Sequence, residues 1–241
     1  MPDKRRHRGR HPQDDGLFAA DQAPALQAAV ADLSWLLGRG YAPQSSLKLA
    51  GDRYGLTVRQ RVAVSRSACS DESLRGRLAR RVDVGALAGR ELAIDGYNLL
   101  ITIESALAGG MILGGRDSTV RDLASVHGSY RSMEETTPAL ALIGRTLDSL
   151  GVPSAWWALD SPVSNSGRLK RRMLELAGEN GWQWSVELLH DPDKALMADN
   201  RPVVSSDSVV LDGCRGWTNL ARHIVQGQVS GAWVVDLGAD L

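Results

Sequence analysis

The stretch from Leu92 to Leu100 constrains the fold of this chain more than any other. It reads Leu-Ala-Ile-Asp-Gly-Tyr-Asn-Leu-Leu, an apolar strand holding one acid, Asp95, with Gly96 directly after it. Downstream, apolar segments of strand length alternate with segments of helical period. This alternation predicts an α/β fold, with a parallel sheet of about five strands and helices on both faces. Strands are expected near 91–95, 155–160, 183–189, 202–205 and 232–236, and helices near 97–108, 118–131, 135–150, 167–179 and 216–226.

The residues before this strand have a different character. The first residues lack apolar periodicity and are predicted to be disordered. A helical part follows, in which Leu26, Val30 and Leu33 recur at helix spacing. Thr57, with Gln60 three residues later, predicts a capping box at the start of one helix. We therefore expect a disordered basic tail at 1–16, a small all-helical basic domain at 17–82, a linker at 83–90 and the α/β domain at 91–241.

Composition sets the class of protein. Apolar residues make up 43% of the 241 residues, which is enough for a packed core. No apolar run reaches the about 18 residues that span a bilayer, and the basic N-terminus lacks the apolar segment of a signal peptide. We expect a soluble, cytoplasmic protein without membrane contact. The two cysteines, Cys69 and Cys214, have no metal-ligand spacing and are predicted to be small buried hydrophobes.

The net charge of zero hides a split between the two halves. Residues 1–90 carry 16 basic and 9 acidic side chains, whereas residues 91–241 carry 12 and 19. A basic half suits phosphate or nucleic acid. An acidic half is typical of a metal site or of a solvated surface. The split therefore favours two domains with different roles.

Acidic residues follow four of the predicted strands. Asp95 and Asp160 end two of them, Asp193 follows the third together with Asp191, and Asp207 follows the fourth. The carboxyl ends of parallel strands meet at one edge of the sheet, so these acids are expected to converge there. Clustered like charges need a cation, and oxygen ligands without His or Cys suit Mg²⁺ or Mn²⁺. The alternative for each Asp is that it caps the helix that follows.

Two short motifs resemble the PIN-like nucleases, in particular their NYN branch. They are Ile94-Asp-Gly-Tyr-Asn-Leu-Leu100 and Val204-Ser-Ser-Asp-Ser208, in which Ser206 precedes the second acid. The resemblance implies that Asp95 and Asp207 bind metal, that Asn98 lies in the same pocket and that Asp160 is a further acidic member. The sequence departs from the NYN pattern at Val209, where a second acid is expected.

The whole chain also resembles an uncharacterised prokaryotic family that pairs a helical domain with this C-terminal domain. The residues that carry this resemblance lie in the helical part, at Arg39-Gly-Tyr41, Gly51-Asp-Arg-Tyr54 and Arg59-Gln-Arg61. This second resemblance implies no function.

Two further segments suggest contact with phosphate. The segment Ser164-Asn-Ser-Gly-Arg-Leu-Lys-Arg-Arg172 places small polar residues at a helix start, where free N–H groups favour anions, and basic residues after them. A cap followed by a solvated basic face is the alternative. The candidate phosphate-binding residues are Ser164, Asn165, Ser166, Arg168, Lys170 and Arg172. In the helical part, the candidates for nucleic-acid contact are Arg53, Arg59, Arg61 and Arg66.

Other polar features have structural interpretations. The Gly-rich stretch 109–115 predicts a turn or short hairpin, and Arg116, Asp117 and Arg121 after it are expected to form a salt-bridged rim. Glu104 is expected on a solvated helix face. Among the histidines, His190 is the one expected near the acids.

The leading hypothesis is a metal-dependent nuclease that uses Mg²⁺ or Mn²⁺ and acts on RNA ahead of DNA. A catalytically inactive PIN-like module that binds nucleic acid or regulates is the alternative. A phosphatase with an Asp nucleophile ranks third, because Tyr97 stands where such enzymes carry a second acid. Self-association into a homo-oligomer is left open.

Overall fold

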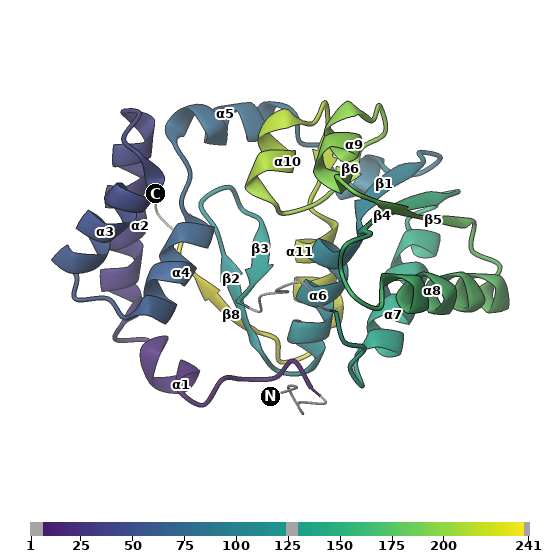
Figure 1. Ribbon diagram of the computed structural model, residues 1–241, viewed down its shortest axis with the longest axis horizontal. Helices are drawn as coiled ribbons and strands as arrows, with labels where there is room; N and C mark the ends of the chain where they lie inside the picture. The colour runs from purple at the N-terminus through teal and green to yellow at the C-terminus, as the bar shows by residue number, and fades with distance from the viewer. Residues whose placement is uncertain (1–6, 124–129, 239–241) are drawn as a thin grey trace.

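The computed structural model describes residues 7–123 and 130–238, in which helices and strands alternate along most of the chain (Figure 1). The helices before the sheet are α1 (Asp14–Leu17), α2 (Ala23–Gly38), α3 (Pro43–Arg53), α4 (Val58–Ser67) and α5 (Asp71–Ala79), with a 3₁₀ turn at Val84–Ala86. The strands are β1 (Leu92–Asp95), β2 (Met111–Gly114), β3 (Val120–Asp122), β4 (Ala155–Asp160), β5 (Trp184–Leu189), β6 (Val203–Val204), β7 (Trp217–Thr218) and β8 (Trp233–Asp236). The later helices are α6 (Gly96–Leu107), α7 (Thr136–Ser149), α8 (Ser166–Asn180), α9 (Pro192–Ala198), α10 (Ser208–Gly213) and α11 (Leu220–Gln228).

The main sheet has five parallel strands in the order β5-β4-β1-β6-β7. This confirms the α/β prediction with its parallel sheet, flanking helices and preceding helical region. The strands alternate between two cores, as a strand covered on both faces must. Leu92 and Ile94 pack into the core that includes residues of α6, α7, α8 and α11. Ala93 faces the other way, toward Leu196 of α9 and Val210 of α10.

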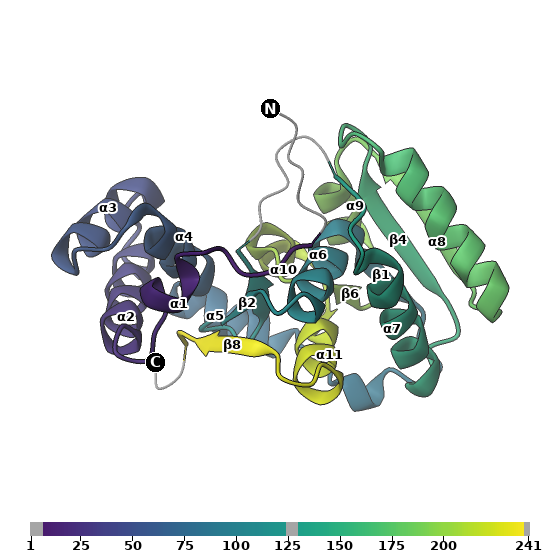
Figure 2. The same cartoon turned by 90° about the horizontal axis from the view of Figure 1, so that it is seen from below.

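A second, three-stranded sheet lies between the helical region and α6, in the order β3-β2-β8 (Figures 1 and 2). Met111 and Leu113 of β2 join a core with Leu26 and Val30 of α2. Ile112, between them, points into the main core instead. The helical region thus shares an apolar core with the second sheet.

One predicted helix differs from the structure near this second sheet. A helix was expected over 118–131, but Val120–Asp122 pairs with β2 as an antiparallel hairpin. The short hairpin expected as one alternative at 109–115 therefore contributes its first strand there, and its connection follows Gly114. Residues 124–129 of the expected helix lie outside the described residues. Asp117 accepts a hydrogen bond from the Thr119 amide at 3.1 Å, and this local bond favours a turn over a helix.

The C-terminal part differs as well. The strand expected at 232–236 does not join the main sheet: β8 pairs with β2, and the fifth place is taken by β7. The helix expected at 216–226 begins only at Leu220. A strand of two residues has too little alternation to be recognised in the sequence, so β7 was assigned to the helix that follows it.

The first described residues are tied to the rest of the chain, which corrects the expected tail at 1–16 for residues from Arg8 onward. Arg8 forms an ion pair with the buried Glu104, and Asp14 is 1% exposed and bonded to Arg59. Each buried acid needs a counter-charge, and the arginines supply it. Within the described residues, no helix is long and apolar enough to cross a membrane.

Candidate functional site

The acids gather where the order of the main sheet reverses. The chain moves from β1 to β4 and β5 on one side, then returns to place β6 on the other side of β1. In open parallel sheets, ligands bind outside the carboxyl ends of the strands at this switch point. Asp95 ends β1, and Ser205, Ser206 and Asp207 directly follow β6. The two motifs found in the sequence therefore meet at the place where a site is expected.

Asp95 is held rigidly at this point. Its Oδ1 accepts a hydrogen bond from the Asn98 amide at 3.4 Å, which caps α6, and its Oδ2 accepts one from the Ser205 hydroxyl at 2.7 Å. Burial raises the pKa of Asp95 to about 7 against the opposing effect of Ser205, and the neighbouring carboxylates of Asp193 and Asp207 also raise it. The carboxyl group is thus preorganised but costly to ionise.

Asn98 and Ser206 connect the two strand ends. The Asn98 Oδ1 accepts hydrogen bonds from the Ser206 amide at 2.8 Å and from the Ser206 hydroxyl at 2.9 Å. Asp207 then caps α10 through Oδ1, which accepts from the amides of Val209 and Val210 at 2.7 and 3.3 Å. In the described chain, the Oδ2 of Asp207 has no hydrogen-bond partner, so that oxygen is available to a ligand.

Asp193 lies within electrostatic range of Asp95, Asp160 and Asp207. Burial raises the pKa of Asp160 and of Asp193, and Asp207, Asp160 and Asp191 add their repulsion at Asp193. Asp191 itself caps α9 by accepting from the Lys194 amide at 3.1 Å. The structure therefore brings these acids within electrostatic range of one another. Asp95, Asp191 and Asp207 also cap the helices that follow them, which was the alternative stated for each Asp.

The main influences on the pKa of the acids in this cluster are burial, hydrogen bonds and other carboxylates. None of the main influences on the pKa of Asp95, Asp160 or Asp193 is a basic side chain. By contrast, arginines hold the pKa of Asp117 and of Asp199 below the ordinary value, in spite of burial. At the strand ends, burial and neighbouring carboxylates thus oppose the ionisation of Asp95, Asp160 and Asp193.

The donor set fits a hard divalent cation in one particular mode. Among residues 7–123 and 130–238, no group of three or more His, Cys, Asp or Glu side chains is arranged to hold a metal ion by itself. Mg²⁺ commonly binds through one or two carboxylates, with water and substrate phosphate oxygens as the other ligands. The pair Asp95 and Asp207 matches that mode, and Asp193 adds a further carboxylate nearby.

The predicted phosphate-binding segment lies at the same edge of the sheet, between β4 and α8. Part of it serves the fold. The Asn165 side-chain amide donates to the Tyr130 carbonyl at 3.0 Å, and the Ser166 hydroxyl to the Ser161 carbonyl at 3.5 Å. Arg172 bonds Thr137 on α7. The residues of this set that are fully exposed are Ser164, Asn165, Arg168 and Arg172, while Lys170 is half-buried.

The arginines of the helical region do not form the free basic surface that was expected. Arg53 pairs with Asp32, and Arg61 pairs with Asp52. Arg59 is bonded to the buried Asp14. Arg66 donates to the Asp122 carbonyl at 2.5 Å. These partners lie far away in sequence or behind a turn, so charge counting alone missed them.

Glu104 was expected on a solvated face and is fully buried instead. Its carboxylate accepts hydrogen bonds from Tyr130 and Thr136, each at 2.5 Å, and pairs with Arg8. These three partners of Glu104 come from distant segments, so the sequence around Glu104 does not indicate that they contact it. Asp95, not Glu104, is the acid of this helix–strand unit that faces the cluster.

Tyr97 lies near the acids and carries a polar group that the described chain does not satisfy. Its hydroxyl is buried and has no hydrogen-bond partner in the described chain, and its ring packs on Tyr130 at 5.2 Å between centroids. Burial, followed by the charge of Asp160, raises the pKa of this hydroxyl. Tyr97 thus lies beside the site with an unsatisfied donor.

We expect Tyr97→Phe to raise the stability of the protein by about 1 kcal/mol, because it removes a buried polar atom that nothing satisfies. Thermal unfolding measures the change. Tyr130→Phe is the matched control: its hydroxyl donates to Glu104, so this variant should unfold at a lower temperature. Equal losses in both variants would contradict the interpretation.

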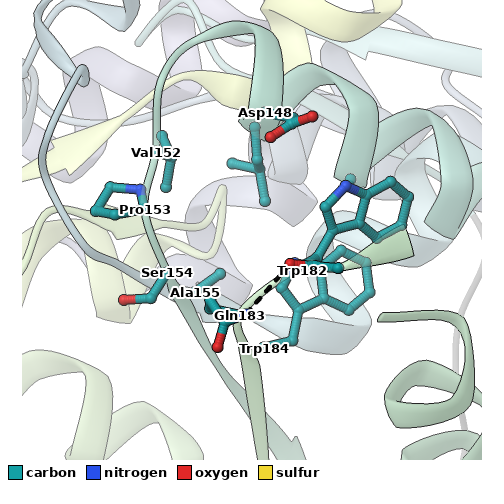
Figure 3. A pocket seen from close by; sticks show the side chains of 11 residues that line it. Asp148, Val152, Pro153, Ser154, Ala155, Trp182, Gln183 and Trp184 are labelled. Carbon is teal, nitrogen blue, oxygen red and sulfur yellow. Dashed lines mark hydrogen bonds between the residues drawn. The ribbon is translucent and has the colours of Figure 1, made fainter. Parts of the chain in front are cut away.

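A separate hollow lies at the opposite edge of the sheet, where β4 and β5 begin (Figure 3). Its volume is about 130 Å³, with Trp182 and Trp184 on one side and Val152 and Pro153 on the other. The two indoles stack at 5.1 Å, and a Cβ added at Gly144 would meet the Trp182 ring at 2.2 Å. Because this hollow lies where the strands begin and the acids lie where they end, it is not part of the acidic site.

Comparisons with known proteins match the chain in two segments. Residues 84–223 match the model of a family described as Domain of unknown function (DUF5616), and residues 25–80 match one described as Protein of unknown function (DUF434). The uncharacterized protein MJ0935 of Methanocaldococcus jannaschii is 26% identical over 187 residues, covering 78% of this chain and 89% of that protein. No solved structure matches significantly. None of these descriptions states an activity, and the resemblance to PIN-like nucleases stays a prediction.

Proposed function

The chain belongs to the family described as Domain of unknown function (DUF5616), so its activity has to be inferred from its own site, and we propose that it is a metal-dependent nuclease whose substrate is RNA. One observation carries this proposal. Asp95 and Asp207 lie at the switch point of a parallel sheet, where burial and the carboxylates of Asp193 and Asp207 raise the pKa of Asp95. Such a group of carboxylates is stabilised when a divalent cation is bound.

The residues would divide the work as follows. Asp95 and Asp207 would hold Mg²⁺ or Mn²⁺, with Asp160 and Asp193 as further acids, and the cation would supply the charge that activates water and stabilises the leaving oxygen. Ser205 orients the Asp95 carboxyl group, and Asn98 fixes the turn before Asp207.

The phosphate chain would be held by the loop between β4 and α8. Ser164, Arg168 and Arg172 are exposed there, at the start of a helix of fifteen residues. N–H groups at a helix start and nearby guanidinium groups bind phosphate oxygens. We therefore propose that this loop, and not the arginines of the helical region, contacts the phosphates of the RNA. The charges of those arginines are already paired.

The test is cleavage of single-stranded RNA with Mg²⁺ or Mn²⁺ added, together with direct measurement of Mn²⁺ binding. The wild type should cleave, and Asp95→Asn should lose at least about 100-fold in rate and bind Mn²⁺ at least tenfold more weakly. Asp199→Asn is the matched control, because Asp199 pairs with Arg201 outside the cluster. A wild type that neither binds Mn²⁺ nor cleaves any of a broad panel of RNAs would sink the proposal.

A second candidate is an inactive PIN-like module that binds nucleic acid. Val209 favours it, since this side chain is 59% exposed at the position where the NYN pattern has a second acid. Salt-dependent RNA binding that survives Asp95→Asn, without turnover, would support this module over the nuclease. The third hypothesis, a phosphatase, requires an acid two residues after Asp95. Tyr97 stands at that position and is buried against Tyr130. Phosphomonoesters should therefore not be turned over.

A further inference from the structure

Three buried charges lie behind the Ser205–Asp207 segment. Asp117 is 1% exposed, and Arg77 and Arg121 are 2% and 8% exposed. Arg121 donates to both carboxylate oxygens of Asp117, at 3.1 and 2.6 Å, and Arg77 donates to it at 2.5 Å. This confirms part of the salt-bridged rim expected around Asp117, but the group is buried and includes a residue from α5.

Both arginines also bond the segment that carries Asp207. The Nε of Arg121 donates to the Ser206 carbonyl at 2.8 Å. Arg77 donates to the two carboxylate oxygens of Asp212 at 2.7 and 2.8 Å and to the Ser208 carbonyl at 3.4 Å. Since α10 runs from Ser208 to Gly213, these bonds hold both ends of that helix as well as the turn before it.

The positive and negative charges of this group are equal in number, so it acts through hydrogen bonds and not through a net charge. Two arginines face Asp117 and Asp212, so no net positive charge is left over for the acidic cluster. Repulsion from Asp193 opposes the placement of Asp207 next to Asp95. Directed hydrogen bonds to the Ser206 carbonyl and to α10 resist that repulsion by fixing the backbone.

We propose that Arg77 and Arg121 are positioning residues that fix the Ser205–Asp207 segment in the orientation the acidic site needs. The functional meaning of this inference rests on the proposed metal-dependent activity. It also assigns a role to the helical region. Arg77 lies within the segment that matches the DUF434 model, whereas Asp117, Arg121 and Asp207 lie within the DUF5616 match. The DUF5616 segment therefore contains the acids and Arg121 but lacks Arg77.

Arg77→Lys and Arg121→Lys test the proposal, because each keeps the charge and loses the forked hydrogen bonds. The readout is amide hydrogen exchange by NMR at Ser206 and Val209, whose N–H groups bond Asn98 and Asp207. Both amides should exchange at least tenfold faster, relative to core amides of α2. Mn²⁺ should bind several-fold more weakly at a temperature at which each variant is fully folded.

Arg59→Lys is the matched control, since Arg59 is likewise forked onto a buried acid, Asp14, away from the site. It should change stability without changing the two amides relative to α2. Asp212→Asn is the milder variant if Arg77→Lys fails to fold, because it removes the ion pair between Arg77 and the C-terminal end of α10 while Asp117 keeps both arginines. It should speed exchange at Val209.

The outcomes separate the two proposals. If Ser206 and Val209 follow the α2 amides in every variant, the arginines only stabilise the fold and the inference is overturned. If the wild type binds Mn²⁺ and the variants bind it equally well, the positioning role is overturned too. If the wild type binds no Mn²⁺, the nuclease proposal fails, and local exchange at the two amides still decides the role of the arginines.

Discussion

Asp95→Asn is expected to remove one large contribution to the pH dependence of stability between pH 4 and pH 7. Burial raises the pKa of Asp95 from its ordinary 3.8 to about 7. Between these two values, the unfolded chain has lost the proton while the folded chain still holds it. Stability therefore falls as pH rises through this window and levels off above about pH 7. The difference amounts to about 4 kcal/mol for a shift of about 3 pKa units.

Urea unfolding at a series of pH values measures this effect. The wild type should lose stability from pH 4 to pH 8 relative to Asp95→Asn, which has no proton to release at that position. Comparing the two proteins at each pH cancels the contribution of the other acids. Asp199→Asn serves as control: hydrogen bonding to Arg201 lowers the pKa of Asp199 below 3.8, so its contribution is lost only in more acidic solution and its curve should run parallel to wild type from pH 5 to pH 8. Parallel curves for wild type and Asp95→Asn would show that Asp95 is ionised at little cost.

Asp117→Ala is expected to destabilise the protein by about 3–5 kcal/mol. The change leaves the buried Arg77 and Arg121 without the carboxylate they share, and an uncompensated buried charge costs that much. For a chain of this size, the melting temperature should fall by roughly 6–20 °C. Circular dichroism during thermal unfolding gives the value.

Asp52→Ala is the comparison for that prediction. Asp52 also pairs with two basic side chains, Lys48 and Arg61, but on the exposed surface. Surface pairs contribute about 0–1 kcal/mol, so its melting temperature should change little. A small effect of Asp117→Ala, similar to that of Asp52→Ala, would mean that water or side-chain movement replaces the lost partner.

The sequence predicted the elements that have a long apolar period. The strand before Asp95 and the strand at 155–160 were predicted within a residue, and the capping box predicted at Thr57 and Gln60 begins α4. Local signals suffice there, because hydrophobic alternation and helix caps act within a few residues. The two-residue strand β7 and the hairpin partner β3 depend on pairing with distant segments, and so they were not recognised.

For the candidate site, the sequence predicted the acids but not what surrounds them. The parallel topology brings Asp95 and Asp207 to one edge, and this follows from strand order alone. The partners that determine their chemistry, Ser205 for Asp95 and Arg121 behind Ser206, are 110 and 85 residues away from the groups they bond. Ion pairs between distant segments also removed the arginines of the helical region from the expected surface.

The shared core described for the second sheet also bears on how the chain folds during synthesis. Leu26 and Val30, near the start of the chain, pack in one core with Val235 and Leu237, near its end. A nascent chain whose first helices have left the ribosome cannot complete this core until β8 has followed. Contacts of such sequence separation slow folding and leave apolar helix faces exposed meanwhile. The helices α2 to α4 are therefore the segment expected to need chaperone protection while the rest of the protein is still being translated.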